Sequence, residues 1–355
     1  MNLPGNERTI SRWNNSVSEK VRARLRATAF PKGSIIFPKI GAAIATNKKR
    51  VLTRPSCVDN NVMALVPDRA HIEPEYLYYL MLTKDLRDFA SDSNPPSIRK
   101  TTVEAWRIPV PPLDEQRRIV DILSRAEGIV RLRREAQKKA AELVPAIFLE
   151  MFGDPATNPK GWPIRPLGEI ADVQGGLQVT SARAALPLEV PYLRVANVHR
   201  GRLDLGEVKM LRVAPHELAR ASLATGDLLI VEGHGNPLEI GRVAVWDGSI
   251  PDCTHQNHLI RARPVPSMLL PEYASACLNS HGGRQALLRS GKTTSGLSTI
   301  SVKNVKNAPI MAPPIALQQK FAVATRQTLA LQHAQRLSGA SAAATMGALL
   351  RSLLG

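Results

Sequence analysis

The stretch "IPVPPLDEQRRIVDIL", Ile108–Leu123, sets a proline-stiffened extended segment directly before a charged helix. A related stretch, "APIMAPPIALQQKFAV", covers Ala308–Val323. In both, two prolines precede an apolar residue and a glutamine follows, which is Gln116 in the first stretch and Gln318 in the second. A chain that repeats such a corner about 200 residues later is predicted to contain two copies of one domain, each followed by a helix.

Two further pairs of segments support this repeat. "KGSIIFPKIGAAIATNKKRVL" (residues 32–52) matches "TGDLLIVEGHGNPLEIGRVAVW" (residues 225–246), and each predicts a strand, a glycine loop and a second strand. "IEPEYLYYLMLTKDLRDF" (72–89) matches "LLPEYASACLNSHGGRQAL" (269–287), and in each Pro-Glu-Tyr opens a helix. The segment before the shared strand is much longer in the second copy. The first copy is therefore predicted to be truncated, with a helical and basic N-terminal part.

The corner at Ile108 leads into a long predicted helix. Asp114 and Glu115 fall in its first turn, where the helix dipole favours negative charge. Apolar residues recur every seven positions in rows that start at Ile119, Ile122 and Leu123, which predicts a coiled-coil seam as far as residue 152. Pro145 is expected to kink or restart this helix. Residues 317–354 repeat the pattern more weakly, and two separate packing helices are the alternative to a paired spacer.

Composition restricts the class of protein. A chain of 355 residues suggests two or three domains, and a net charge of +17 implies a polyanionic partner, most often nucleic acid. Aromatic residues make up 4% of the chain, which favours duplex DNA over RNA or single strands. Three cysteines without paired spacing fit a reduced cytoplasm, and neither a signal segment nor a membrane span is expected.

Several segments together resemble a known family. "PVPPLDEQRRIVDIL", "FLEMFGDPATNPKGWPIRPLGEIADVQGG", "PYLRVANV" and "GDLLIVEGHGN…IGRVAVW" resemble the specificity subunit of type I restriction-modification systems, over nearly all of residues 32–355. The resemblance implies an α+β fold with two α/β target-recognition domains, the first one shortened, separated by two long helices packed as an antiparallel coiled coil. The expected boundaries are residues 1–107 and 154–312 for the two domains, and 108–153 and 313–355 for the helices.

The resemblance also implies a function. A specificity subunit reads a split sequence in double-stranded DNA and so sets the target for methylation and cleavage by partner subunits. The expected partners are methylase subunits, two of them, and restriction-translocase subunits. This chain would have no catalytic residues and no cofactor of its own, because S-adenosylmethionine, ATP and Mg are expected on the partners. Two alternatives stay open: a half-type specificity subunit that serves as a scaffold for methylase assembly, and a DNA methyltransferase.

Three motifs that suggest other chemistry are interpreted as structural. "NPPS" (residues 94–97) lacks the aromatic residue with which an amino-methyltransferase stacks a flipped base, so a proline turn is favoured. The glycines of "EGHGNPLEIG" precede a strand-like pattern, whereas a nucleotide-binding turn would precede a helix. Cys253, His255 and His258 in "CTHQNH" lack a second ligand pair, so a polar strand edge or a DNA contact is favoured over zinc.

Candidate binding residues are long donors and amides in predicted loops. In the second copy the candidate DNA contacts are Gln178, Thr180, Ser181, Arg183, Arg194, Asn197, His199, Arg200, Arg202, His234, Asn236, Lys292, Thr293, Thr294 and Ser295. In the first copy they are Lys39, Lys48, Lys49, Arg50, Arg99 and Lys100, which fit phosphate contacts better than base readers. Near Pro145, the apolar residues Phe148, Met151 and Phe152 have no evident cover within the chain and are predicted to bind a methylase subunit.

Overall fold

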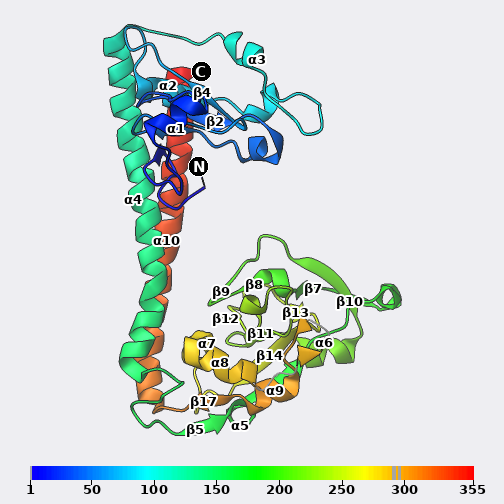
Figure 1. Ribbon diagram of the computed structural model, residues 1–355. Coiled ribbons are helices and arrows are strands. Elements are labelled where there is room, and N and C mark those ends of the chain that lie inside the picture. Colours follow the sequence, from blue (N-terminus) through cyan, green and yellow to red (C-terminus); the bar gives the residue numbers. More distant parts are fainter. Residues whose placement is uncertain (1, 290–292, 295–296) are drawn as a thin grey trace. The chain divides into compact units, whose positions relative to one another are not determined.

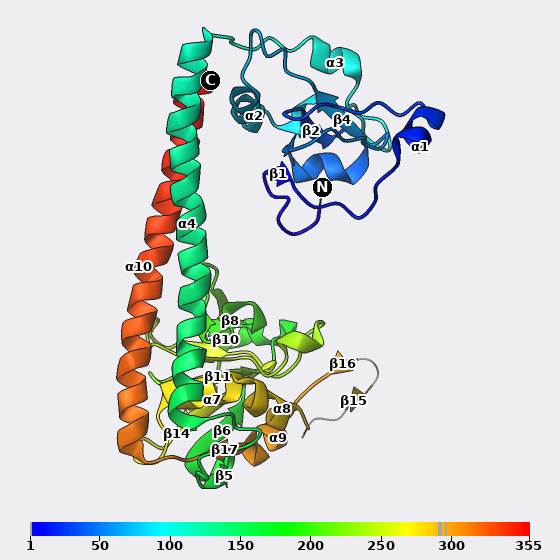
Figure 2. The same cartoon turned by 60° about the vertical axis from the view of Figure 1, so that its left-hand side comes forward.

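The computed structural model describes residues 2–289, 293–294 and 297–355 (Figures 1 and 2). The chain divides into two compact units. Unit 1 consists of Met1–Ala136 and Gln335–Gly355, and unit 2 consists of Gln137–Ala334. Two 40-residue helices, α4 (Leu113–Phe152) and α10 (Ile315–Leu354), contribute to both units.

Unit 1 is built on a four-stranded sheet with the order β1-β3-β2-β4. The central strand β2 is buried along its whole length and pairs antiparallel with β3 and β4, while β1 lies parallel to β3. Helix α2 (Pro74–Leu82) covers the sheet and lies between it and α4 (Figure 2). The strands are β1 (Thr9–Ile10), β2 (Ile35–Pro38), β3 (Arg50–Leu52) and β4 (Val62–Leu65). The short helices are α1 (Glu19–Arg24), η1 (Gly41–Thr46), η2 (Leu86–Phe89) and α3 (Lys100–Glu104).

Unit 2 contains a corresponding four-stranded sheet and further strands. Its main sheet has the order β12-β11-β14-β6, and β11 pairs antiparallel with both β12 and β14. These strands are β6 (Ala171–Gly175), β11 (Leu228–Val231), β12 (Val243–Val245) and β14 (Leu259–Pro264). A second sheet, β10-β7-β13, is formed by β7 (Leu188–Leu193), β10 (Lys209–Val213) and β13 (Thr254–His255).

The remaining elements of unit 2 are short. Two-stranded pairs join β5 (Ile164–Pro166) to β17 (Pro309–Met311), β8 (Val198–His199) to β9 (Arg202–Leu203), and β15 (Thr293–Thr294) to β16 (Leu297–Ser298). The helices are α5 (Leu167–Ile170), η3 (Ser181–Ala185), η4 (Val195–Asn197), α6 (Pro215–Ala221), η5 (Pro237–Glu239), α7 (Pro271–Asn279), α8 (His281–Arg289) and α9 (Val302–Asn307). Among the described residues, no helix is long and apolar enough to cross a membrane.

The predicted repeat is present in the backbone as well as in the sequence. Gly33 and Gly226 precede β2 and β11 with φ of +91° and +93°, a conformation that favours glycine. A Cβ atom on these glycines would lie 3.2 Å from Cγ of Pro74 and 3.1 Å from Cγ of Pro271. Those prolines open α2 and α7, so the same glycine–proline contact joins strand to helix in each unit.

A buried glutamine joins each proline corner to the helix that covers the sheet. Gln116 and Gln318 are both 0% exposed. Gln116 donates from Nε2 to the carbonyls of His71 (2.8 Å) and Pro111 (2.7 Å), and its Oε1 accepts from the backbone N–H of Glu73 (2.8 Å). The amide oxygen therefore satisfies the N-terminal backbone of α2, whose cap residue Glu73 provides no side-chain cap of its own.

Gln318 makes the equivalent bonds in unit 2. Its Nε2 donates to the carbonyls of Met268 (3.1 Å) and Pro313 (2.9 Å), and its Oε1 accepts from the N–H of Leu270 (2.9 Å) at the start of α7. The alignment of the two glutamines in the sequence thus reflects one hydrogen-bonding arrangement used twice.

The two units differ where the sequence copies differ. Among the described residues, unit 1 has no counterpart of β6 or of the β10-β7-β13 sheet. The two sheets share three strands, which are β3-β2-β4 in unit 1 and β12-β11-β14 in unit 2. The fourth strand of unit 1, β1, lies beside β3. The fourth strand of unit 2, β6, lies at the other edge, beside β14. Unit 1 is therefore the shorter version of the repeated fold.

Helices α4 and α10 pack together in antiparallel fashion in both units. In unit 1, Ile119 and Leu123 of α4 share a core with Leu354 at the end of α10. In unit 2, Phe148 and Phe152 at the end of α4 pack against Phe321 near the start of α10. The rows that start at Ile119 and Leu123 are buried or half-buried along α4, whereas Phe148 and Phe152 lie outside both rows.

Two expectations about α4 are wrong. The row that starts at Ile122 was expected to join the seam, but Ile129 is 53% exposed and Leu143 41% exposed. A coiled-coil seam consists of two rows of residues, spaced alternately by three and four positions along the helix. The rows that start at Ile119 and Leu123 have this spacing, so the row that starts at Ile122 faces outward. Pro145 was expected to kink or restart the helix, and the restart is wrong, because α4 runs as one helix from Leu113 to Phe152. The aromatic contacts of Phe148 and Phe152 hold the turns that follow this proline.

The expectation that Phe148, Met151 and Phe152 lack cover within the chain is also wrong. Phe148 is 1% exposed and Phe152 is 0% exposed. Both contact Tyr273 of α7 and Phe321 of α10, with ring centroids 4.7–5.9 Å apart, and Met151 packs at the edge of the same cluster. These residues form the core of unit 2, and no surface for a partner follows from them.

Candidate nucleic-acid interface

Three arginines from separate elements converge on one loop of unit 2, η5 (Pro237–Glu239). Arg284 of α8 donates to the carbonyl of Pro237 (2.8 Å), and Arg200, at the turn after β8, donates to the carbonyl of Leu238 (3.1 Å). Arg242 donates to the carbonyl of Val195 (2.7 Å) and forms an ion pair with Glu239 (2.8 Å). Three positively charged side chains therefore contact this loop, which contains one carboxylate, that of Glu239.

The charge in this arginine cluster is not balanced. Arg200 and Arg284 form no ion pair with any residue that the structure describes. Burial lowers the pKa of Arg200, and the positive charge of Arg284 lowers it further. Like charges held together in this way leave a favourable place for an anion, and guanidinium groups suit phosphate oxygens.

Neighbouring candidates lie on the same loop and on the β8–β9 hairpin. The backbone N–H of Asn236 donates to Nδ1 of His234 (2.9 Å), and Oδ1 of Asn236 caps η5 by accepting from the N–H of Leu238 (3.0 Å). His199 and Arg202 face each other across the β8–β9 pair. Burial and the charge of Arg202 lower the pKa of His199.

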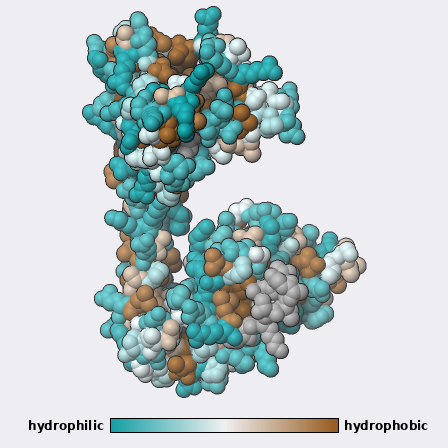
Figure 3. Space-filling view, in the orientation of Figure 1, coloured by the Kyte–Doolittle hydropathy of each residue, from teal (hydrophilic) through white to brown (hydrophobic). Residues whose placement is uncertain are grey.

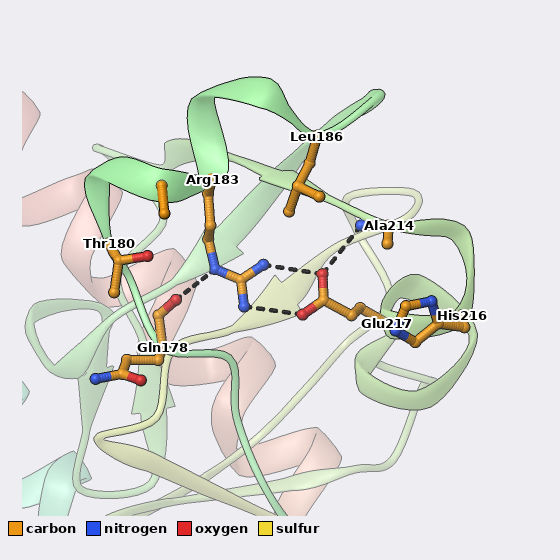
Figure 4. Close-up of a pocket in the computed structure, with 8 residues that line it drawn as sticks. Gln178, Thr180, Arg183, Leu186, Ala214, His216 and Glu217 are labelled. Atoms are coloured by element: carbon orange, nitrogen blue, oxygen red, sulfur yellow. Dashed lines mark hydrogen bonds and ion pairs between the residues drawn. The ribbon is translucent and has the colours of Figure 1, made fainter.

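Gln178, Thr180 and Arg183 line a separate open pocket of about 350 Å³ (Figure 4). Arg183 donates to both carboxylate oxygens of Glu217, at 2.9 and 3.0 Å, and also bonds to the carbonyl of Gln178. The hydrogen bonds from Arg183 and from the N–H of Ala214 lower the pKa of Glu217 to about 2. The guanidinium is therefore neutralised within the pocket, while the side chains of Gln178 and Thr180 are exposed.

Two candidates have their polar groups engaged inside unit 2. Asn197 is 2% exposed, and its Nδ2 donates to the carbonyls of Asp204 (2.8 Å) and Glu207 (2.9 Å). Arg194 forms an ion pair with Glu207 (2.6 Å). Their assignment as DNA contacts stays a prediction, and in the structure both residues fix the loop at 204–207.

Two of the candidate DNA contacts of unit 1 are buried or partly buried. Lys49 is 2% exposed and donates to Oδ1 of Asn47 and the carbonyl of Lys84, both at 2.6 Å, and burial lowers its pKa to about 8. Arg50 is partly buried and bonds to the carbonyl of Lys49 (2.7 Å). The other four, which reach the surface to different degrees, are Lys39, Lys48, Arg99 and Lys100.

Four predicted contacts fall in a segment that is described only in part. Lys292 and Ser295 lie outside the described residues, and Thr293 and Thr294 form β15. Ser181 begins η3 at an exposed position. These assignments stay predictions.

The "CTHQNH" motif does not bring its possible ligands together. Cys253 and His255 are both 0% exposed, whereas His258 is exposed and lies 3.7 Å from Glu232. Burial raises the pKa of Cys253 to about 12 and lowers that of His255 to about 4. Among the described residues, no group of three or more His, Cys, Asp or Glu side chains could hold a metal ion.

Sequence reasoning missed Arg242 and Arg284. Arg284 was assigned only to a helix that matches the first copy, and it lies far along the chain from Arg200. Arg242 lies only three residues after Glu239, in the same glycine loop, whereas the contact of Arg284 with η5 results from tertiary folding, which no local motif could have shown.

The sequence of this chain is similar to that of known proteins. Residues 7–142, which contain the shorter copy, match the family model described as the type I restriction modification DNA specificity domain. The specificity subunit of the type I restriction enzyme MjaIX of Methanocaldococcus jannaschii is 26% identical over 342 residues, covering 88% of this chain and 74% of that protein. The specificity subunit of EcoKI of Escherichia coli is 28% identical over 281 residues, covering 74% of this chain and 58% of that protein.

A solved structure shows the same fold. A chain from a study of complex assembly and conformational transition in a type I restriction-modification system aligns with a TM-score of 0.59 at 20% identity, covering 92% of this chain and 82% of that one. The family model, the two relatives and the fold agree with the internal repeat and the helix pair described above. Residues 7–142 of this chain thus match the type I restriction modification DNA specificity domain, and the chain is similar in sequence to specificity subunits of type I restriction enzymes.

Proposed function

We propose that this chain recognises a sequence in double-stranded DNA and directs partner subunits to it. Methylation and cleavage are then the work of methylase and restriction-translocase subunits, which hold the S-adenosylmethionine, ATP and Mg that the chemistry requires. Base identity comes from the loops of the two repeated units, and unit 2 has the larger set of exposed polar loops.

The arginine cluster at η5 carries this proposal. Arg200 and Arg284 offer two guanidinium groups without a carboxylate partner among the described residues, next to the exposed amide of Asn236. Contacts from arginine to phosphate fix the position of a protein on the duplex, while amides and other long donors read base edges. The cluster thus combines a phosphate anchor with a candidate base reader on one loop.

A complex of this chain with its methylase subunits tests the proposal. The complex should select one sequence from a pool of random duplexes, and Arg200→Gln with Arg284→Gln should weaken its binding by at least tenfold at 0.1 M salt. Arg165→Gln with Lys303→Gln removes the same charge from exposed positions of unit 2 and should have a much smaller effect. A complex that selects no sequence would refute the proposed function.

The helix pair offers a surface for the methylase that differs from the one predicted from sequence. In unit 2, Leu143 and Leu149 of α4 are 41% and 47% exposed, and Leu331 of α10 is 49% exposed. Hydrophobic patches interrupt the hydrophilic surface of these helices (Figure 3). Leu143 and Leu149 are therefore candidates for contacts with the methylase subunit.

Variants in α4 test this surface. Leu143→Ser with Leu149→Ser should reduce recovery of the methylase subunit with this chain. Ala141→Ser with Ala146→Ser places the same side chain at exposed positions of the same helix and should leave recovery unchanged. Equal recovery with both double variants would exclude these leucines from the interface.

A further inference from the structure

Residues 11–29 of unit 1 form an excursion whose two ends are fixed close together. Ile10 pairs with Leu52 in the β1–β3 ladder, and Phe30 exchanges two backbone hydrogen bonds of 3.0 Å with Ser56. The chain thus leaves the sheet beside Leu52 and returns beside Ser56, four residues further along the same neighbouring segment. Just before the excursion, Arg8 anchors the chain through ion pairs with Glu75 of α2 and Glu127 of α4.

Packing does not explain this excursion, which we call the basic arm. No side chain between residues 11 and 29 is buried, and α1 within it buries none of its six residues. Trp13, Val17 and Leu25 are 49%, 52% and 62% exposed. Figure 2 shows α1 well away from α4, beyond the β sheet of unit 1. A long segment that adds nothing to the core is typical of a binding loop.

The charge of the arm is strongly positive. Five of its residues are basic, namely Arg12, Lys20, Arg22, Arg24 and Arg26, and Glu19 is its one acidic residue. Glu19 pairs with Arg22. Lys20, Arg24 and Arg26 form no ion pair with any described residue, so three cations on a short helix and its end face solvent without compensation.

The backbone of Arg26 adds an independent observation. Its φ is +50°, in the left-handed region, at the position after the cap residue Leu25 of α1. Glycine or asparagine is favoured at such a helix end, because a longer side chain is strained there. Arginine at this position therefore does not stabilise the fold, and a role of its guanidinium group outside the fold would account for its presence.

We infer that the basic arm of unit 1 binds the phosphate backbone of DNA. The inference rests on the proposed function and deepens it: the arm supplies affinity without reading bases. It precedes the shared strand β2, in the part of the sequence where unit 2 instead has β6 to β10. Unit 1 therefore anchors the complex on DNA, and unit 2 contributes more of the sequence choice.

The test measures DNA binding by the complex with methylase subunits as a function of salt. Each lost phosphate contact lowers the slope of log affinity against log salt by about 0.9, which is roughly eightfold in affinity between 1 M and 0.1 M salt. Arg24→Gln with Arg26→Gln should thus weaken binding by up to about sixtyfold at 0.1 M salt and reduce the slope by about 1.8. The preferred sequence should stay the same.

A second variant separates binding from folding. Arg26→Gly should raise the thermal stability of unit 1, or leave it unchanged, while it weakens DNA binding by up to about eightfold at 0.1 M salt. A merely structural arginine would lose stability and affinity together. Arg69→Gln with Arg107→Gln removes two charges from exposed positions of unit 1 outside the arm and serves as the matched control.

The outcomes are distinct. Arm variants that bind DNA as the control does, or that lose the methylase subunit instead of DNA, would overturn the inference. An altered sequence preference in the arm variants would overturn it as well, because phosphate contacts carry no base identity. If the unmodified complex selects no sequence at all, the proposed function itself fails.

Discussion

The replacement Gln318→Met tests how unit 2 is held together at its proline corner. Methionine is close to glutamine in size and shape, so no large cavity is expected. It removes three hydrogen bonds, to the carbonyls of Met268 and Pro313 and from the N–H of Leu270. An unsatisfied buried backbone group costs about 1–3 kcal/mol, so with one N–H and two carbonyls affected we expect a loss of about 3 kcal/mol.

This loss should be easy to measure. For a unit of about 200 residues, 3 kcal/mol corresponds to a fall of roughly 6–12 °C in Tm. Hydrogen exchange followed by mass spectrometry should also become faster at the N-terminus of α7, where Leu270 loses its acceptor. Gln319→Met changes the exposed neighbour of Gln318 and should alter Tm by less than about 2 °C.

Unit 1 supplies an internal comparison, because Gln116 makes the same three bonds there. Gln116→Met should speed exchange at the start of α2 and leave α7 unchanged. The reasoning would be refuted if Gln318→Met were no more destabilising than Gln319→Met. It would also be refuted if loosening caused by either variant appeared in the opposite unit.

Two further predictions concern spacing and pH. Deletion of one heptad from α4 (Arg133–Lys139) together with one from α10 (His333–Gly339) shortens both helices by about 10 Å. This length corresponds to about three base pairs of DNA. Sequencing of methylated sites should therefore show a spacer that is about three base pairs shorter, with both half-sites unchanged. Changed half-sites with an unchanged spacer would exclude the helices as the spacing element. The pKa of buried His255 is lowered to about 4, below its unfolded value, so it contributes stability that is complete above about pH 6.5 and is lost as pH falls toward 4. His255→Phe should therefore flatten the pH dependence of unfolding in this range, His258→Gln should not, and equal profiles for the two variants would contradict the assignment.

The repeat and the helix pair could be predicted because their signals are local. Gln116 and Gln318 recur at the same place after two prolines, and each donates one hydrogen bond to a proline carbonyl of its own corner. The other two bonds of each glutamine reach backbone groups just before Pro-Glu-Tyr, and that motif is itself visible in both copies. The rows that start at Ile119 and Leu123 give the seam because a heptad period alone fixes which side of a helix is apolar.

The cover of the aromatic cluster and the arginine cluster could not be predicted in this way. Phe148 and Phe152 looked uncovered because their neighbours Tyr273 and Phe321 lie far away along the chain. Arg284 meets Arg200 only after α8 has packed beside η5. Such contacts depend on tertiary packing, which periodicity and motif spacing do not encode.

The same limit applies to the candidate DNA contacts. Asn197 has the residue type of a base reader, yet burial and two backbone carbonyls occupy its amide. Lys49 has the type of a phosphate contact, yet it is buried beside Asn47. Residue type indicates the chemistry that is possible, and only exposure and free hydrogen-bonding groups show which side chains can use it.

The central claim is that this chain chooses the DNA sequence for a partner methylase, with unit 2 reading part of it. The most direct measurement maps methylated bases in cells that contain the methylase with this chain, without it, or with residues 154–312 replaced by the matching residues of a type I specificity subunit with a different target. We expect one methylated motif with the intact chain, none without it, and a motif altered in one part after the replacement. The same methylated motif in all three cells would contradict the account.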